Sequence, residues 1–269
     1  MPIEWLMYPV LGVIAGILAG LLGVGGGLVL VVALAWLLPL QGVPLPMAMH
    51  AALATSLASI VITAAASARA HHRRGSVLWP TVAWLLPGLL VGGWLGSGIA
   101  THLSGDVLRH GVIAYCVLAA LQLLLDWPRS VARADGVASP RGVGLSVAGV
   151  VIGGVSALVG IGGGSMTVPV LIWRGVVPVR AVGTSSACGI GIGLASASGY
   201  ALQANVSGMP VGSWGYVFLP AAIGIAVTSL IAAPYGARLA HHFSGVTLKR
   251  VFATFLLLVA TSLALAAPA

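Results

Sequence analysis

The chain has 269 residues, of which 59% are hydrophobic and 6% are charged, with a formal net charge of +8 and a mean hydropathy of +1.10. A soluble domain carries about 25% charged residues, so this composition argues against a soluble protein and predicts an all-α polytopic membrane protein. The basic residues stand in short clusters between apolar runs, so we expect the lipid bilayer as a partner and no nucleic acid.

Eight apolar runs follow one another along the chain, separated by polar or turn-rich segments. They cover residues 7–38, 48–68, 77–100, 108–125, 143–173, 181–204, 214–237 and 246–267. The longest polar segment, 126–142, contains three arginines and is interpreted as a basic cytoplasmic linker. It separates a first transmembrane repeat, 1–125, from a second transmembrane repeat, 143–269.

Four motifs recur in the same order in the two halves. The first half has GVGGG at 23–27, ATS at 54–56, WLLP at 84–87 and HLSGDVLR at 102–109. The second half has GIGGG at 160–164, GTS at 183–185, VFLP at 217–220 and HFSGVTLK at 242–249. Four ordered matches at a nearly constant offset indicate an internal duplication.

The first apolar run of each half contains a glycine run. Residues 7–38 as one helix would be about 48 Å long at a rise of 1.5 Å per residue. The hydrocarbon core of a bilayer is about 30 Å thick. The helix is therefore either strongly tilted, or it breaks at the glycines and turns back as a re-entrant hairpin.

The basic residues distinguish these topologies. If both glycine runs form hairpins, eleven of the 12 Lys and Arg residues lie on one side of the membrane, in the segments 69–74, 126–142, 174–180 and 238–250. Only Arg109 lies on the other side. The positive-inside rule favours this arrangement over eight full spans, which would divide the charges evenly. We therefore predict two inverted repeats, each a Gly-broken re-entrant helix hairpin plus three transmembrane helices, with external termini; eight full spans remain the alternative.

The glycine runs are candidate binding elements. Glycine lets a chain turn and lets a ligand approach the backbone, and the helices that resume near Leu28 and Ser165 would present free N–H groups and the positive ends of their dipoles. Two such helix starts facing each other would bind a small oxyanion. We expect the contacting residues to be Gly25, Gly26, Gly27, Gly162, Gly163, Gly164 and Ser165.

The Thr-Ser pairs that follow the glycine runs supply hydroxyl groups without full charge. Such donors can hold an anion and still release it. We expect these hydroxyls to complete the binding shell, and they belong to Thr55, Ser56, Thr184 and Ser185. The alternative for each of them is a hydrogen bond to a carbonyl oxygen of its own helix.

We expect close helix packing to explain most of the 38 glycines, and three series have the spacing of such contacts. These series are Gly12/Gly16/Gly20, Gly88/Gly92/Gly96 and Gly189/Gly193. Trp94 lies deep in its run, so we expect it to pack between helices.

The sequence gives no indication of an enzyme, a cofactor or a metal site. No Asp or Glu lies within an apolar run, and the motifs of nucleotide binding, zinc proteases and serine hydrolases are absent. Cys116 and Cys188 lack metal-ligand spacing and are interpreted as buried apolar residues. His50 is interpreted as a hydrogen-bonded histidine at a helix end, with a proton-coupled role as the alternative.

The chain resembles the sulfite exporter TauE/SafE family, also called the toluene sulfonate uptake permease family. The resemblance is carried by GLLGVGGG at 20–27, ALVGIGGGS at 157–165, AVGTS at 181–185 and the paired Leu-Pro segments. It implies a multi-pass permease of the prokaryotic inner membrane for small sulfur-containing anions. Ala54 stands where the second half has Gly183, and Leu28 where it has Ser165, so donors from the second half are expected to dominate.

We therefore expect a secondary carrier for a small sulfur-containing oxyanion, such as sulfite or an organosulfonate, bound at the midplane between the two glycine runs. The alternatives are a passive anion channel and a cation-coupled carrier of another small organic anion. The identity of the anion, the direction of transport and the oligomeric state are left open by the sequence.

Overall fold

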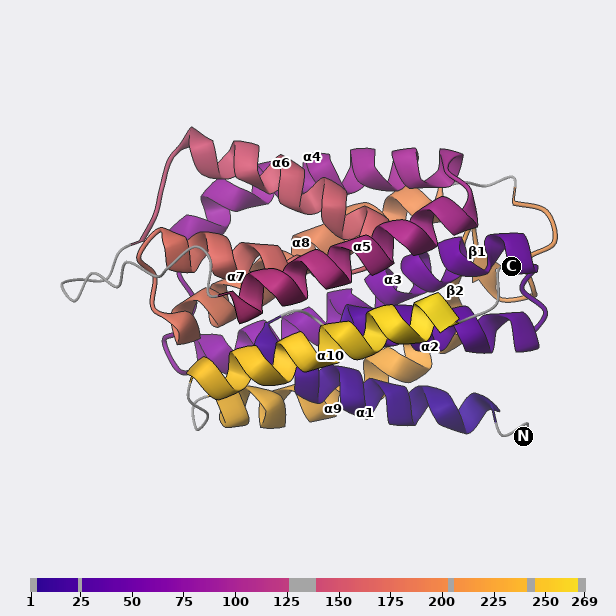
Figure 1. Cartoon of the computed structure of the whole chain (residues 1–269), viewed down its shortest axis with the longest axis horizontal. Helices are drawn as coiled ribbons and strands as arrows, with labels where there is room; N and C mark the ends of the chain where they lie inside the picture. Colours follow the sequence, from indigo (N-terminus) through magenta and orange to yellow (C-terminus); the bar gives the residue numbers. More distant parts are fainter. Residues whose placement is uncertain (1–3, 24–25, 126–138, 203–205, 241–244, 266–269) are drawn as a thin grey trace.

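The computed structural model of the chain describes residues 4–23, 26–125, 139–202, 206–240 and 245–265. Its helices, shown in Figure 1, are α1 (Glu4–Leu22), α2 (Gly27–Leu40), α3 (Leu45–His72), α4 (Trp79–His102), α5 (Gly105–Leu124), α6 (Val143–Val159), α7 (Gly164–Trp173), α8 (Pro178–Ala201), α9 (Leu219–Ala240) and α10 (Gly245–Leu265). Two short antiparallel strands, β1 (Ser213–Trp214) and β2 (Val217–Phe218), precede α9 with Ser213 opposite Phe218. The predicted all-α class is confirmed, and most of the linker 126–142 lies outside the described residues.

Both predicted helix breaks are present. We call residues 23–26 the first break and residues 160–163 the second break. Gly23 and Gly26 have φ of 69° and 68°, and Gly160 and Gly163 have φ of 75° and 74°. Residues that carry a side chain rarely adopt this left-handed backbone conformation. Glycine is therefore needed at all four positions. Gly26 and Gly163 are the N-caps of α2 and α7.

Each broken run returns to the end of the bundle at which it started. In the first run, Tyr8 near the start of α1 and Leu37 near the end of α2 belong to one hydrophobic cluster. In the second run, a Cβ atom on Gly144 would lie 3.9 Å from the guanidinium of Arg174, which follows α7. These contacts give both runs the shape of a helical hairpin.

The second helix of each hairpin is shorter than a membrane span. Helices α2 and α7 contain 14 and 10 residues, so they are about 21 and 15 Å long and too short to cross a 30 Å core. These lengths favour the hairpin arrangement over eight full spans, and the membrane topology stays a prediction. By length and composition, the described helices that could cross a membrane are α3, α4, α5 and α9. Helix α8 is also 24 residues long, but it is rich in Gly, Ser and Thr.

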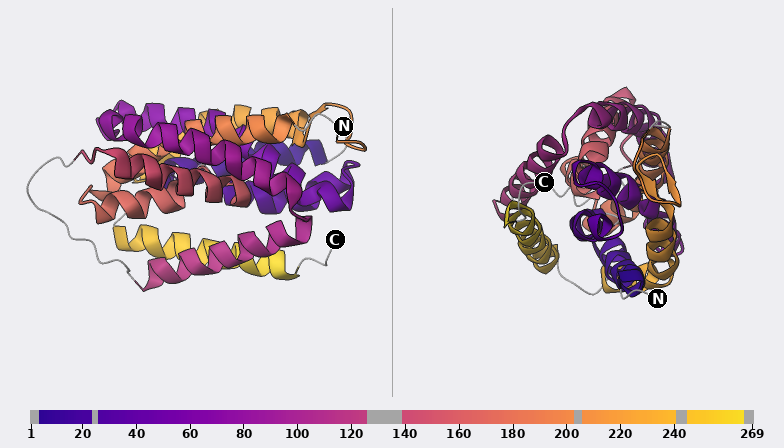
Figure 2. Two further views of the ribbon diagram at one scale, coloured as in Figure 1. Left: turned by 90° about the horizontal axis from the view of Figure 1, so that it is seen from above. Right: turned by 90° about the vertical axis from the view of Figure 1, so that its right-hand side faces the viewer.

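The main helix contacts are preserved when α1–α5 are exchanged with α6–α10. The two largest interfaces are α4 with α6 and α1 with α9, which are each other's counterparts. Helices α3 and α8 pack on each other, as do α5 and α10. The views in Figure 2 show α5 and α10 side by side along one flank of the bundle. Helix α1 begins at the end of the bundle at which α10 ends, whereas α6 begins at the opposite end (Figure 1).

The predicted packing glycines lie at these interfaces. A Cβ atom on Gly16 would lie 2.8 Å from the carbonyl oxygen of Ser229 across the α1–α9 interface. A Cβ atom on Gly92 would lie 2.0 Å from the carbonyl oxygen of Val150 across the α4–α6 interface. The backbones of paired helices therefore touch, which only glycine allows.

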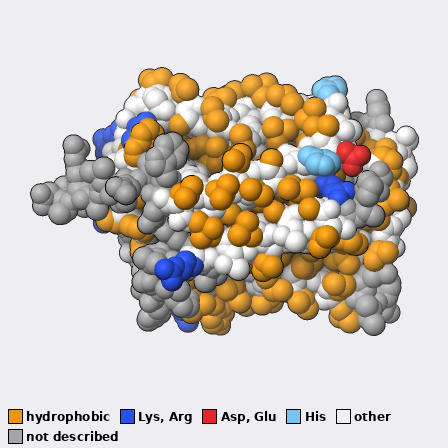
Figure 3. Space-filling view, in the orientation of Figure 1, with side chains coloured by type: hydrophobic (Ala, Val, Ile, Leu, Met, Phe, Trp, Pro, Cys, Tyr) orange, Lys and Arg blue, Asp and Glu red, His pale blue; other side chains and the backbone are white. Residues whose placement is uncertain are grey.

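The surface matches the predicted charge distribution. In Figure 3, hydrophobic side chains cover much of the visible face, and most of its Lys and Arg side chains lie at one end. That end holds the C-terminal ends of α3, α7 and α9 and the starts of α6 and α8. Arg109 lies near the start of α5, at the other end of the bundle, and follows Asp106 by three residues on the same helix.

Candidate functional site

The start of α2 is in direct contact with the second break inside the bundle. A Cβ atom on Gly27 would lie 2.4 Å from the carbonyl oxygen of Gly160 and 3.1 Å from Cα of Ile161. The start of α2 therefore packs against the second break without an intervening side chain. The sequence predicted that the two glycine runs face each other, and the structure brings them together.

The serines of the two Thr-Ser pairs connect the breaks to the central helices. Ser56 on α3 is fully buried, and its hydroxyl lies 3.1 Å from the carbonyl oxygens of both Gly27 and Gly160. Ser185 on α8 is also fully buried and donates to the carbonyl oxygen of Gly23 at 3.1 Å. Each serine thus holds a break that belongs to the other half of the chain.

The threonines of the same pairs hold the starts of two other helices. The hydroxyl of Thr55 accepts a hydrogen bond from the N–H of Phe218 at 3.0 Å, directly before α9. The hydroxyl of Thr184 accepts one from the N–H of Leu78 at 3.0 Å, directly before α4. These two contacts are counterparts in the two halves.

The threonine contacts also correct one motif match. The second helical residue of α9 is Pro220, and the second helical residue of α4 is Pro80. The motif match between WLLP at 84–87 and VFLP at 217–220 pairs Pro220 with Pro87, which lies inside α4. The structure pairs Pro220 with Pro80 instead, because both prolines follow the residue that the threonine holds.

All four hydroxyls of the Thr-Ser pairs are therefore engaged with the backbone in this conformation. None of them bonds to a carbonyl of its own helix, whereas the neighbouring Ser59 donates to Thr55 at 2.8 Å in that way. Thr55, Ser56, Thr184 and Ser185 have no exposed surface. Their contacts make them connectors between the halves, and a direct contact with an anion stays a prediction.

The start of α7 carries a polar contact that the sequence did not reveal. Gly164 is the first helical residue, and Ser165, only 7% exposed, forms a hydrogen bond with the hydroxyl of Tyr115 on α5. Gly162 lies beside α8, where its carbonyl oxygen would be 3.2 Å from a Cβ atom on Gly189. Tyr115 stands in an otherwise aliphatic run, and its hydroxyl is the only signal that could have identified it.

The corresponding start of α2 has no such hydroxyl. Gly26 is the N-cap, Gly27 is the first helical residue, and Leu28 follows with 1% of its surface exposed. Gly25, another predicted site residue, lies outside the described residues. The N–H groups of the first two residues of each helix have no carbonyl one turn earlier within the helix, so both starts offer backbone donors, whereas the N–H of Met166 already donates to the carbonyl of Gly163 at 3.2 Å.

His50 and the two cysteines have the surroundings expected from the sequence. His50 lies 3.0 Å through Nε2 from the carbonyl oxygen of Leu103 and stacks on Tyr216, as expected for a histidine at a helix end. Cys116 and Cys188 are free and buried. The described residues contain no group of three or more His, Cys, Asp or Glu side chains that could hold a metal ion.

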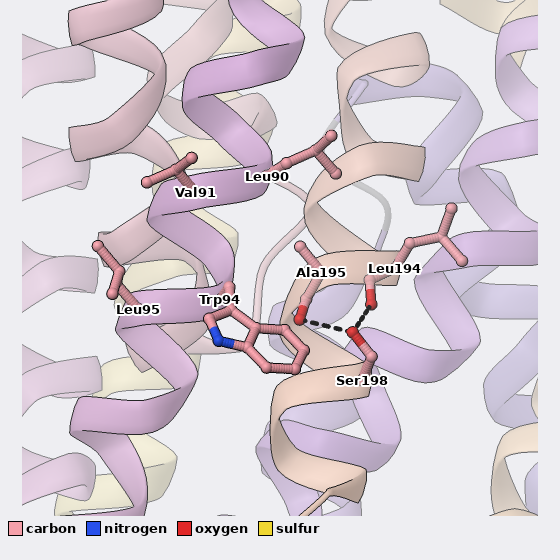
Figure 4. A pocket seen from close by; sticks show the side chains of 7 residues that line it. All are labelled: Leu90, Val91, Trp94, Leu95, Leu194, Ala195 and Ser198. Atoms are coloured by element: carbon pink, nitrogen blue, oxygen red, sulfur yellow. Dashed lines mark hydrogen bonds between the residues drawn. The ribbon is translucent and has the colours of Figure 1, made fainter.

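A groove of about 600 Å³ lies between α4 and α8 and is shown in Figure 4. It is lined by Leu90, Val91, Trp94, Leu95, Leu194, Ala195 and Ser198. The hydroxyl of Ser198 bonds to carbonyl oxygens of its own helix, so the groove presents an apolar surface. Trp94 is 46% exposed here, so the expectation that it packs between helices was wrong. The groove lacks the donors that an anion needs.

Comparison with known proteins identifies related sequences. The model of the family described as "Sulfite exporter TauE/SafE" matches residues 8–263. A "Probable membrane transporter protein" of Haemophilus influenzae is 35% identical over 257 residues, which cover 94% of this chain and 95% of that protein. No solved structure matches the chain significantly.

More distant relatives carry similar names. A "Probable membrane transporter protein" of Xylella fastidiosa (strain Temecula1) is 34% identical over 197 residues, covering 71% of each chain. The "Probable membrane transporter protein YunE" of Bacillus subtilis is 28% identical over 193 residues, covering 65% of this chain and 70% of that protein.

Proposed function

Because the chain belongs to the sulfite exporter TauE/SafE family, we propose that it is a secondary carrier for a small sulfur-containing oxyanion such as sulfite or an organosulfonate. The observation that carries this proposal is the contact between the start of α2 at Gly27 and the second break, from which α7 emerges. Half-helices that begin inside a bundle are the elements with which many transporters bind substrates.

Neutral donors suit this task. The first-turn N–H groups of α2 and α7 and the positive ends of their dipoles attract negative charge. The described arginines lie at the ends of the bundle, as at Arg69, Arg174 and Arg238 near helix C-termini. A bound anion is then held without a fixed counter-charge, which allows its release.

The proposed membrane arrangement is that of two inverted repeats in the inner membrane of a prokaryotic cell. The basic end of the bundle faces the cytoplasm, according to the positive-inside rule. Both termini then lie outside. Alternating access arises when one group of helices rocks against the other around the two breaks.

Transport into proteoliposomes tests the function. We expect saturable uptake of sulfite or methanesulfonate and accelerated uptake when the vesicles contain the same unlabelled anion. A Gly163→Val variant should abolish uptake, because the added side chain meets Ile192 in a left-handed backbone conformation. Gly175→Val is the matched control, since Gly175 also has a positive φ but open space around it.

Two alternatives predict different results in the same vesicles. A passive channel gives large unitary currents and no counterflow. A cation-coupled carrier of another organic anion gives uptake that follows a Na⁺ or pH gradient and ignores sulfur oxyanions. Absence of flux for every anion offered, by protein that is folded and inserted, would rule the proposal out.

Cysteine labelling tests the topology. In a background without Cys116 and Cys188, the variants Arg74→Cys and Arg174→Cys should react from the same side of the membrane. Asp106→Cys should react from the opposite side. Labelling of positions 74 and 174 from opposite sides would contradict the re-entrant hairpins.

A further inference from the structure

A row of buried polar side chains runs along α3 toward the basic end of the bundle. It begins beside Ser56, which contacts the second break, and it takes every fourth residue of the helix, so its members lie on one face. This α3 row consists of Thr55, Ser59, Thr63, Ser67 and His71, each no more than 1% exposed. An ionisable residue buried in a membrane protein marks a pathway for ions or protons, and here it is the last member of the row.

Neighbouring helices close the inner part of the α3 row. The hydroxyl of Thr63 lies 2.6 Å from that of Ser229 on α9, and the hydroxyl of Ser67 lies 2.9 Å from that of Ser186 on α8. Ser67 also donates to the carbonyl oxygen of Ala19 on α1 at 3.3 Å. Hydrogen bonds through water are nearly as favourable as direct ones. These helices can therefore separate and admit water without leaving the hydroxyls unpaired.

His71 closes the end of the row. Its Nε2 atom lies 3.1 Å from the carbonyl oxygen of Gly20 on α1, three residues before the first break. A carbonyl oxygen only accepts, so Nε2 is the donor. On the other side, the Cβ atom of His71 lies 3.1 Å from the position of a Cβ atom on Gly183 of α8. His71 thus contacts both α1 and α8 at the basic end of the bundle.

The second half closes the corresponding position with a different group. Counted from Thr55 and Thr184, His71 corresponds to Tyr200 on α8. The hydroxyl of Tyr200 donates to the carbonyl oxygen of Ala157 at 3.2 Å, three residues before the second break. Helix α8 ends opposite the end of α3, so this contact lies at the other end of the bundle. An imidazole gains a proton near neutral pH and a phenol does not, so only the basic end can respond to protons.

The surroundings of His71 carry no negative charge. At this end of the bundle, the titratable or charged side chains on α3, on the turn after it, on α8 and on α9 behind α1 are Arg69, His72, Arg73, Arg74, Arg180, Tyr235 and Arg238. The acidic residues in the described part of the chain, Glu4 and Asp106, lie at the opposite end. A proton on His71 therefore adds a buried charge that no described carboxylate compensates.

We propose that His71 is the proton-binding element of a gate at the basic end, which is closed when the imidazole is neutral and opens when it is protonated. A buried charge without a counter-charge is costly, and water that enters along the α3 row removes this cost. The hydrogen bond to Gly20 becomes charge-assisted but does not replace the hydration of the ion. The dipole of α3 favours the charged imidazole in both states, because His71 stays in the last turn of that helix. The inference rests on the proposed function, in which this gate controls access of the anion from the cytoplasm.

The reactivity of a cysteine behind the gate tests the inference on purified full-length protein in detergent. In the background without Cys116 and Cys188, Ser67→Cys places a thiol one turn inside His71, and its labelling rate with N-ethylmaleimide reports opening. This rate is divided by the rate in His71→Gln, whose amide can donate to Gly20 but does not titrate, so the pH dependence of the thiol cancels. We expect the ratio to rise by roughly threefold to thirtyfold from pH 8 to pH 6, because one proton shifts an equilibrium by at most about tenfold per pH unit.

Two controls separate the gate from other effects of pH. His72→Gln removes the neighbouring exposed imidazole, which accepts from Nε1 of Trp79 at 3.1 Å, and should leave the rise unchanged. Ser196→Cys places the thiol at the counterpart of Ser67, where exchanging His71 for Gln should make no difference at either pH. If His71→Gln does not fold, the ratio of the Ser67→Cys rate to the Ser196→Cys rate with His71 intact must rise between the same pH values.

The outcomes separate the gate from the proposed function. A ratio that stays constant or falls as the pH falls overturns the gate, and so does loss of the rise in His72→Gln. Uptake of methanesulfonate is measured on the same protein. Labelling that follows pH without any uptake leaves the gate standing and refutes the carrier, whereas uptake with a constant labelling ratio refutes the gate and leaves the carrier standing.

Discussion

The shared hydrogen bond of Ser56 gives the most direct test of the way in which the breaks are held. Its hydroxyl is 3.1 Å from the carbonyl oxygens of Gly27 and Gly160. Gly27 begins α2, so its carbonyl also accepts the N–H one turn later in the helix. Gly160 precedes α7, so its carbonyl has no such helical donor. The Ser56→Ala substitution therefore leaves the buried carbonyl of Gly160 without its hydrogen-bond donor.

An unsatisfied buried carbonyl costs about 1–3 kcal/mol. For a chain of this size that corresponds to a decrease of roughly 2–10 °C in the midpoint of thermal unfolding. Ser59→Ala is the matched control, because Ser59 is equally buried on the same helix and donates only to the carbonyl of Thr55. That carbonyl keeps its helical N–H, so Ser59→Ala should change the midpoint little.

The midpoints are measured in detergent by the loss of monodisperse protein after heating. Both variants remove one hydroxyl from a fully buried serine, so differences in volume and helix propensity cancel. Equal midpoints for Ser56→Ala and Ser59→Ala would refute the argument that this hydroxyl holds the two breaks together.

Two further predictions concern glycines. Gly26→Ala should lower the unfolding midpoint more than Gly175→Ala does: both carry about 1–2 kcal/mol of left-handed strain, but only at Gly26 does the new methyl group meet backbone, at 2.3 Å from the carbonyl oxygen of Ala15. Gly92→Ala should separate α4 from α6 and reduce the yield of monodisperse protein, whereas Gly98→Ala, with open space around it, should be neutral or slightly stabilising. Similar behaviour within either pair, measured by thermal unfolding and size-exclusion chromatography, would contradict these assignments.

Much of the fold could be predicted because its signals are local. Consecutive glycines weaken a helix wherever they occur, so the breaks follow from the sequence alone. Glycines spaced four apart predict close interfaces, and Gly16 and Gly92 lie at such interfaces. The start of α9 was missed: the apolar run at 214–237 begins with a strand pair around Gly215, whose φ is 55°.

The roles of the Thr-Ser pairs could not be predicted, because their partners are distant in sequence. Ser56 bonds to a residue 104 positions away, and Thr55 to a residue 163 positions away. The pattern of a threonine followed by a serine on a buried helix does not distinguish hydroxyls that contact a ligand from hydroxyls that contact a neighbouring backbone. Tyr115 was missed for the same reason, since its contact with Ser165 spans 50 positions.

The largest interfaces of the bundle, α1 on α9 and α4 on α6, join a hairpin of one half to a long helix of the other. We therefore expect neither half to fold stably by itself, because separation would expose glycine-lined backbone surfaces that each half buries against the other. Exchange of α1–α5 with α6–α10 preserves these contacts, so two copies of a single-repeat chain would have to pair about a two-fold axis to form the same interfaces. Once both copies share a single polypeptide, each is free to diverge: one hairpin can gain hydroxyls while its twin keeps leucines.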